Sequence, residues 1–66
     1  MTVEEVESRV RRIDAMSNDD ESAHEEEDEL HRDVITYIAE GGFGKASELA
    51  AAALRTQDIE FSRWCA

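Results

Sequence analysis

The chain has 66 residues, of which 17 are acidic and 7 are lysine or arginine, so its formal net charge is −10. This charge disfavours direct binding to nucleic-acid phosphates and adsorption to anionic lipid, and it favours a basic protein partner or a bound cation. A chain of this length forms one domain at most and buries only about 60% of its unfolded surface, so its stability is expected to be marginal and self-association would add to it.

The composition favours a folded helical protein. Hydrophobic residues make up 41% of the chain, proline is absent, and the strand-forming residues are few and scattered. The longest apolar-rich runs without a charge, residues 34–39 and 49–54, are far shorter than the roughly 20 residues of a membrane span. Because the N-terminus is acidic and lacks an apolar signal-peptide core, we expect a cytoplasmic protein.

The first predicted helix covers about residues 3–16. Thr2 and Glu5 form a capping box at its start. Apolar residues follow at helical spacing: Val3, Val6, Val10, Ile13 and Met16. The polar run at 17–20 has turn and N-cap chemistry without glycine or proline, which predicts a tight connection to the next helix.

The second predicted helix covers about residues 20–40 and carries an acid on its apolar face. On a helix that turns about 100° per residue, one arc about 100° wide contains the predicted buried face. Its apolar members are Ala23, Leu30, Val34, Tyr37 and Ile38. Glu27 falls in the same arc. A carboxylate there needs a partner, and the sequence offers Arg9 or Arg12 of the first helix, or the indole N–H of Trp64.

The third predicted helix covers about residues 45–65, after a glycine-rich breaker at 41–44. One broad arc of it, with Gln57 in its middle, collects Ala46, Leu49, Ala50, Ala53, Leu54, Phe61, Trp64 and Cys65. Ile59 points the opposite way. Either the helix is therefore disturbed near Thr56 and Gln57, or Ile59 is exposed for a partner.

Three helices with short connections predict an all-α fold, a small antiparallel three-helix bundle. In such a bundle Phe61 and Trp64 come level with the acid-histidine segment at 21–24, about one helical turn from Glu27. We therefore expect these two parts of the chain at one end of the molecule.

Four side chains of the second helix have a spacing that suits a metal. His24, Glu27, Asp28 and His31 lie at i, i+3, i+4 and i+7 and can project from one side, where zinc or another divalent transition metal would find ligands. Cys65, the single cysteine, could add a soft ligand from the third helix. The alternative is that each imidazole bonds to a nearby carboxylate or lies on Trp64.

Two enzyme motifs are only partly present. The segment His24-Glu25-x-x-Asp28 has the H-E-x-x-H pattern with its second histidine replaced, and the chain is too small for a third ligand and a substrate cleft. Acid pairs within residues 25–29 resemble the magnesium-binding pairs of all-helical nucleotide pyrophosphatases. The candidate second pair, Glu4 and Glu7, lies near the other end of the bundle. We therefore expect a protein that is not an enzyme.

The acid run at residues 19–29 holds eight carboxylates in eleven positions and no lysine or arginine. It is either a solvated helix face or a surface for a basic partner, and such a surface can imitate the charge of nucleic acid. The residues predicted to contact a partner are Asp19, Asp20, Glu21, Glu25, Glu26, Glu29 and Ile59.

The sequence also resembles a group of small proteins. An acid-rich A-H-x-x-E-D-x-L-H segment is followed by a C-terminal A-L-R-T-Q-D-I-x-F-x-R-W-C-A, and together they cover residues 22–66. This pairing resembles uncharacterised proteins of actinobacteriophages and their actinobacterial hosts. The resemblance implies a bacterial or phage-infected cytoplasm and brings no activity with it.

Two functional hypotheses follow from the sequence. The first is a non-enzymatic acidic interaction module, a phage or bacterial regulator that self-associates and binds a basic protein surface. The second is a metal-binding helical protein that uses the His/acid cluster of the second helix.

Overall fold

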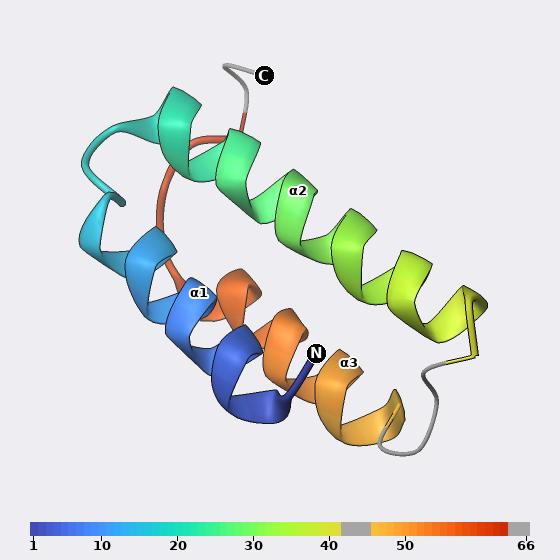
Figure 1. Ribbon diagram of the computed structural model, residues 1–66. Helices are drawn as coiled ribbons and strands as arrows, with labels where there is room; N and C mark the ends of the chain where they lie inside the picture. The colour runs from blue at the N-terminus through green and yellow to red at the C-terminus, as the bar shows by residue number, and fades with distance from the viewer. Residues whose placement is uncertain (42–45, 64–66) are drawn as a thin grey trace.

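The computed structural model describes residues 1–41 and 46–63, which form three α-helices and one short 3₁₀ helix (Figure 1). In chain order these are α1 (Val3–Ala15), α2 (Asp20–Ala39), α3 (Ala46–Leu54) and η1 (Arg55–Asp58). Each α-helix contacts both of the others, and no strand occurs in the described parts of the chain. Figure 1 shows α2 running antiparallel to its two neighbours. The expected all-α three-helix bundle is confirmed.

The first two helices begin where side chains satisfy their free N–H groups. Thr2 Oγ1 accepts a hydrogen bond from Glu5 N at 3.1 Å and caps α1. Asp19 caps α2 by accepting from Ser22 N at 3.2 Å and from Ser22 Oγ at 3.0 Å. Beyond the end of α2, Gly41 takes a positive φ of 98°, a value that glycine adopts without steric cost. These local signals fix both helices within about one residue of the predicted bounds.

The third helix is much shorter than predicted, since α3 ends at Leu54 and not near residue 65. The Thr56 hydroxyl donates to Ala53 O at 3.2 Å, and the backbone tightens into η1. Ile59 then adopts an extended conformation, is half-buried, and packs against the core. Of the two alternatives for this region, the disturbed helix is therefore the one observed, and the exposed Ile59 was wrong. Trp64 and Cys65 lie outside the described residues.

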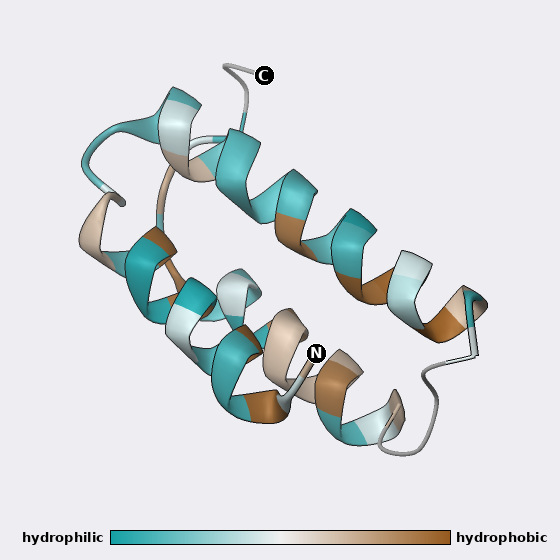
Figure 2. Ribbon diagram, in the orientation of Figure 1, coloured by the Kyte–Doolittle hydropathy of each residue, from teal (hydrophilic) through white to brown (hydrophobic). Residues whose placement is uncertain are grey.

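The core consists of apolar residues from all three α-helices (Figure 2). Its fully buried members are Val6, Ile13, Ala23, Leu30, Val34, Leu49, Ala52 and Ala53. The predicted buried face of α2 agrees with this set, and Tyr37 and Ile38 pack on it half-buried. The predicted face of α3 is rotated, however: Ala52 and Thr56 are buried, whereas Leu54 is 61% exposed. None of the described helices is long and apolar enough to cross a membrane.

Shortening a core side chain of α2 tests this packing. Leu30→Ala is expected to lower the free energy of unfolding by about 2–5 kcal/mol, because Leu30 is fully buried and its truncation leaves a cavity. The matched control is Ile35→Ala, since Ile35 is 67% exposed and its loss is expected to change stability by less than about 0.5 kcal/mol. Urea unfolding followed by circular dichroism measures both. Equal decreases in the free energy of unfolding for Leu30→Ala and Ile35→Ala would contradict the described buried face of α2.

Candidate functional site

The acid on the buried face of α2 is bound by an arginine from the end of the chain. Glu27 is only 3% exposed. Its Oε1 accepts from Arg63 Nε at 2.7 Å, and its Oε2 accepts from Arg63 Nη2 at 2.8 Å. Gln57 Nε2 donates a longer bond of 3.3 Å to the same Oε2. A two-pronged bond of this kind matches the planar guanidinium to the carboxylate and is among the stronger pairings in proteins.

Arg63 belongs to an extended segment, residues 59–63, which we call the C-terminal strap. The strap runs from η1 back to the start of α2, as Figure 1 shows. A second bond fixes it there, because Ser62 N donates to Asp20 Oδ1 at 2.9 Å. The acid-histidine segment and Phe61 therefore lie at the same end of the bundle, although an extended chain and not a helix brings them together.

The Arg63 guanidinium also organises the backbone around it. Nη2 donates to the carbonyls of Thr56 at 2.9 Å and Ile59 at 3.3 Å, and Nη1 donates to the Phe61 carbonyl at 3.4 Å. Its central carbon lies 3.9 Å from the centroid of the Phe61 ring, a cation-π contact. One side chain thus satisfies the buried carboxylate and three backbone oxygens.

The expected salt bridge to Glu27 exists, but its expected partners were wrong. Arg9 instead bonds to Asp33 at 3.0 Å, and Arg12 bonds to Glu26 at 2.8 Å. Arg9 and Arg12 therefore pair with acids at the edge of α2 and not with its buried face. Trp64, the other expected partner, lies outside the described residues.

The surroundings of Glu27 keep it ionised. Burial raises the pKa of its carboxyl group, but the hydrogen bonds from Arg63 and its positive charge, with contributions from the neighbouring Thr56 and His31, outweigh burial. The net result is a pKa below the ordinary value of 4.5. Glu27 at neutral pH is consequently an acceptor for a cation and has no proton to donate.

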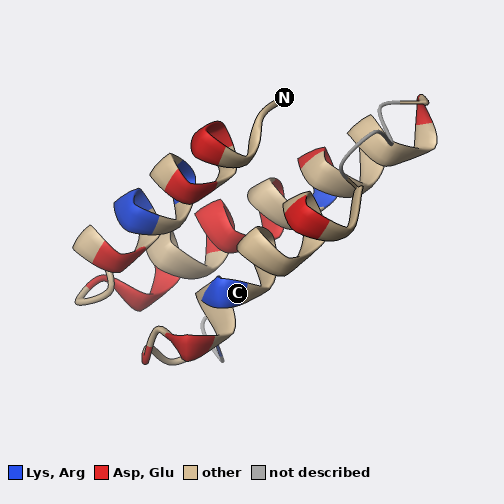
Figure 3. Ribbon diagram, turned by 90° about the horizontal axis from the view of Figure 1, so that it is seen from below, with Lys and Arg blue, Asp and Glu red and all other residues tan. Residues whose placement is uncertain are grey.

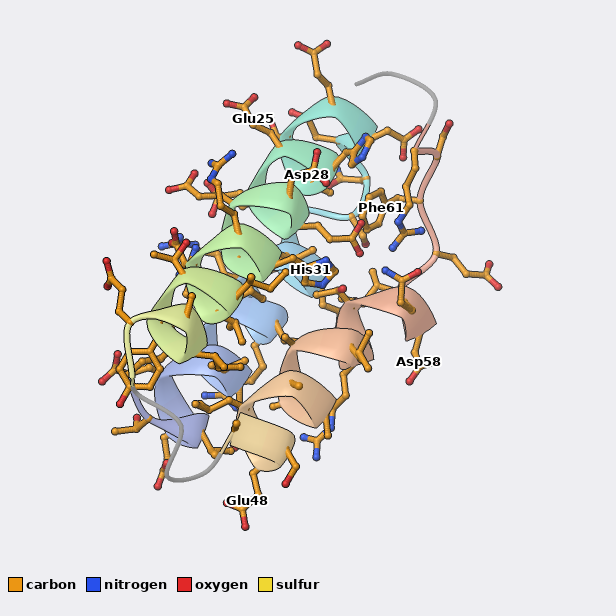
Figure 4. All side chains as sticks on the ribbon, turned by 90° about the vertical axis from the view of Figure 1, so that its right-hand side faces the viewer. Glu25, Asp28, His31, Glu48, Asp58 and Phe61 are labelled. Carbon is orange, nitrogen blue, oxygen red and sulfur yellow. The ribbon has the colours of Figure 1, made fainter. Side chains whose placement is uncertain are left out.

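The two histidines of α2 have different partners. His31 Nε2 lies 3.2 Å from the Ala53 carbonyl and 3.0 Å from Thr56 Oγ1, and Figure 4 shows its ring between α2 and α3. Because a carbonyl can only accept, Nε2 carries the proton in the bond to Ala53. His24 Nε2 lies 3.5 Å from Asp28 Oδ2, while its buried Nδ1 has no hydrogen-bond partner in the described parts of the chain.

The four residues with metal-ligand spacing do not face one common point. Glu27 binds Arg63, His31 bonds toward η1, and only His24 and Asp28 approach each other. Within residues 1–41 and 46–63 no three His, Cys, Asp or Glu side chains are close enough together to hold a metal ion. Cys65, the fifth residue of the predicted set, falls outside these ranges.

Five of the eight carboxylates at residues 19–29 have partners within the chain. Asp19 caps α2, Asp20 holds the strap, Glu26 pairs with Arg12, Glu27 pairs with Arg63, and Asp28 faces His24. These contacts assign a structural role to Asp19, Asp20 and Glu26, which the sequence had placed among the partner-binding residues.

The other three carboxylates form what we call the acid ridge: Glu21, Glu25 and Glu29. They are exposed, lie at i, i+4 and i+8, and make no hydrogen bond or ion pair with any described residue. Figure 4 shows Glu25 pointing away from the bundle, and Figure 3 shows acidic residues on all three α-helices. Neighbouring like charges at i,i+4 destabilise a helix by about 0.2–0.5 kcal/mol per pair, so the ridge has an energetic cost.

An exposed apolar side chain lies on α2 beside the acid ridge. Ile35 is 67% exposed, and at 100° per residue it falls about 40° from Glu21, 80° from Glu25 and 120° from Glu29 on the helical wheel. It is six residues beyond Glu29, about 9 Å along the helix axis. The exposed side of α2 therefore carries the acid ridge in its first half and, displaced around the helix, an apolar side chain in its second half.

Comparison with protein-family models, with curated proteins and with solved structures found no match to this chain.

Breaking the Glu27–Arg63 pair is expected to destabilise the protein. Arg63→Met should lower the free energy of unfolding by about 3 kcal/mol, because it leaves Glu27 charged and buried without its cation. Arg55→Met is the matched control, since the Arg55–Glu7 pair is solvent-exposed and its loss should cost about 0–1 kcal/mol. Urea denaturation of both variants provides the measurement. Similar losses in the two variants would show that the strap is not held by this pair.

The lowered pKa of Glu27 predicts a specific dependence on pH. A carboxyl group whose pKa is lower in the folded state stabilises the fold fully above its unfolded pKa, near 4.5, and loses this contribution as the pH falls through the folded value. The stability difference between the wild type and Glu27→Gln should therefore be largest above about pH 5 and shrink toward pH 3. Urea titrations at several pH values measure it. A difference that is constant, or that grows in acid, would contradict the ionised pair.

Proposed function

We propose that this chain is a non-enzymatic interaction module that binds a basic protein partner through the acid ridge on α2. The proposal rests on a difference among the eight acidic residues at 19–29, namely which of them have a hydrogen-bond or ion-pair partner. Five have partners inside the molecule, whereas the three of the acid ridge are exposed at i, i+4 and i+8 and have no such partner among residues 1–41 and 46–63. Lysine or arginine from another protein would relieve the repulsion among them.

The charge and the apolar contact have separate roles in this proposal. A negative ridge on a chain of net charge −10 accelerates encounter with a basic surface and rejects acidic ones. Exposed ion pairs contribute only about 0.2–1 kcal/mol each, so a stable complex also needs buried apolar area. Ile35, exposed on α2 to the side of the ridge nearest Glu21 on the helical wheel, supplies an apolar contact. The partner therefore has basic residues and, about 9 Å farther along the helix and displaced around it, an apolar side chain.

The state of the polar residues near the core supports binding over catalysis. Glu27 is held ionised by Arg63, and His31 Nε2 is bonded to Ala53 and Thr56. These are two of the buried or half-buried titratable groups, the kind whose environment can suit acid–base chemistry. Both are occupied in joining η1 and the strap to α2. Together with the resemblance to actinobacterial and phage proteins, this favours a small cytoplasmic regulator that acts by contact.

Neutralising the acid ridge tests this function. The triple variant Glu21→Gln, Glu25→Gln and Glu29→Gln should bind the partner at least roughly tenfold more weakly, because three exposed ion pairs are lost. The matched control removes the same charge elsewhere: Glu4→Gln, Glu48→Gln and Glu60→Gln, all at exposed positions. Affinity capture from an actinobacterial lysate identifies the partner, and calorimetry with the purified partner at low and high salt measures the affinity.

The expected result is a loss of the partner with the ridge variant, retention with the control, and weaker binding at high salt. A ridge variant that captures the same partners with the same affinity as the wild type would refute the proposal.

A further inference from the structure

The C-terminal strap is organised largely around its own arginine. Two of the carbonyls that Arg63 binds, those of Ile59 and Phe61, belong to the strap, and so does the aromatic ring against which its guanidinium lies. Because both partners of each of these contacts belong to the strap, the contacts can be kept when the strap changes position. The strap therefore presents its guanidinium already oriented for a carboxylate, at little additional cost in conformational entropy.

The surface that receives the strap belongs to a part of the chain distant in sequence. Glu27 lies 36 residues before Arg63, and Asp20 lies 42 residues before Ser62. Both acceptors are side chains of α2, two helical turns apart. An equivalent α2 from another molecule presents the same two acceptors with the same spacing, because the helix that carries them is rigid.

The connection between the strap and the bundle is short and largely exposed. Gln57, Asp58 and Glu60 are exposed, and Figure 4 shows Asp58 pointing away from the bundle. At this turn Ile59 N donates to Thr56 O at 3.1 Å, and Gln57 reaches Glu27 by its 3.3 Å bond. A backbone change at Asp58 would redirect the strap and keep the bonds from Arg63 to the Ile59 and Phe61 carbonyls, while the bond to Thr56 O and the packing of Ile59 and Phe61 on the core would have to be remade.

We propose that the strap also docks on α2 of a second copy of this chain, so that Arg63 of each copy pairs with Glu27 of the other in a strap-exchanged dimer. A second copy is favoured over an unrelated arginine peptide because the strap supplies the arginine, the aromatic ring beneath it and the two carbonyls in one segment. Reciprocal exchange closes with twofold symmetry and does not propagate into a fibre. Each Glu27 site of the dimer is completed by a residue of the other copy.

Two opposing effects set the conditions for exchange. The short connection gives the strap an effective concentration of about millimolar at its own α2, so the closed monomer prevails in dilute solution. Each copy carries a charge of −10, so the copies repel each other and salt should increase the fraction of dimer. This salt dependence is opposite in sign to that expected for a basic partner on the acid ridge, and the two interactions are distinguishable on that basis.

Mixing two complementary variants tests the exchange. Glu27→Gln and Arg63→Met chains each lack one half of the pair, but an exchanged heterodimer rebuilds one complete Glu27–Arg63 site. After joint unfolding and refolding at high concentration, native mass spectrometry should show the mixed dimer. Its melting temperature should be about 5 °C or more above that of either variant alone. In the control, Glu27→Gln mixed with the Glu27→Gln/Arg63→Met double variant has no pair to rebuild and should gain nothing.

A mixture that melts as the sum of its components, without mixed dimers, would overturn the proposal. Should the variants fail to fold, the wild type provides the second test. Isotope-labelled and unlabelled wild-type chains are refolded together at millimolar concentration, and filtered nuclear Overhauser spectra are recorded. Contacts from Arg63 of one copy to Glu27 of the other are expected. A purely monomeric protein with contacts only within one chain would equally overturn it.

Discussion

The structure depends on one carboxylate on the buried face of α2. An ionised side chain without a partner in that position would cost several kcal/mol. Arg63 offsets this cost, and in doing so it determines where the last described residues lie. Because the guanidinium also bonds to carbonyls of Thr56, Ile59 and Phe61, the same contact defines the path of the chain after η1. Glu27 thus connects the middle of the second helix with the end of the chain.

A leucine at position 27 would suit the apolar stripe and require no partner. Buried ion pairs frequently add little net stability relative to apolar residues of similar size, and their better-supported role is to select one arrangement among several. That role fits this bundle. Ile59 and Phe61 of the strap pack on the core without a fixed direction, and a two-pronged bond of defined geometry on Glu27, together with the bond to Asp20, specifies both the place and the direction of the strap.

The acidity of α2 therefore has more than one origin. Capping, cross-helix pairing and strap binding account for five acids at residues 19–29, and each of these roles is satisfied within the chain. The acid ridge differs from them because its charges repel one another and face outward. The helix dipole stabilises only Glu21, in the first turn of α2, and gives no reason for Glu25 and Glu29. We therefore interpret the ridge as a surface for a partner and the other acids as parts of the fold.

The sequence predicted what local periodicity controls and missed what distant contacts control. The caps of α1 and α2, the buried stripe of α2 and the anomalous Glu27 were all visible, because each depends on residues within a few turns of one another. The end of α3 was not visible in the sequence. It depends on the hydrogen bond from the Thr56 hydroxyl to Ala53 O and on the ion pair between Arg63 and Glu27, and neither follows from helical spacing. Helical spacing likewise showed which of His24, Glu27, Asp28 and His31 share a side, but not that Glu27 and His31 already have partners.

The most direct measurement is the coupling free energy between Glu27 and Arg63 in a double-mutant cycle. It uses the wild type, Glu27→Gln, Arg63→Met and the double variant, unfolded in urea at neutral pH. A central role for the pair predicts that the two single substitutions are far from additive, with a coupling of about 1–3 kcal/mol. Additivity within about 0.3 kcal/mol would mean that Glu27 and Arg63 act independently, and would contradict the role given to this pair in placing the C-terminal strap.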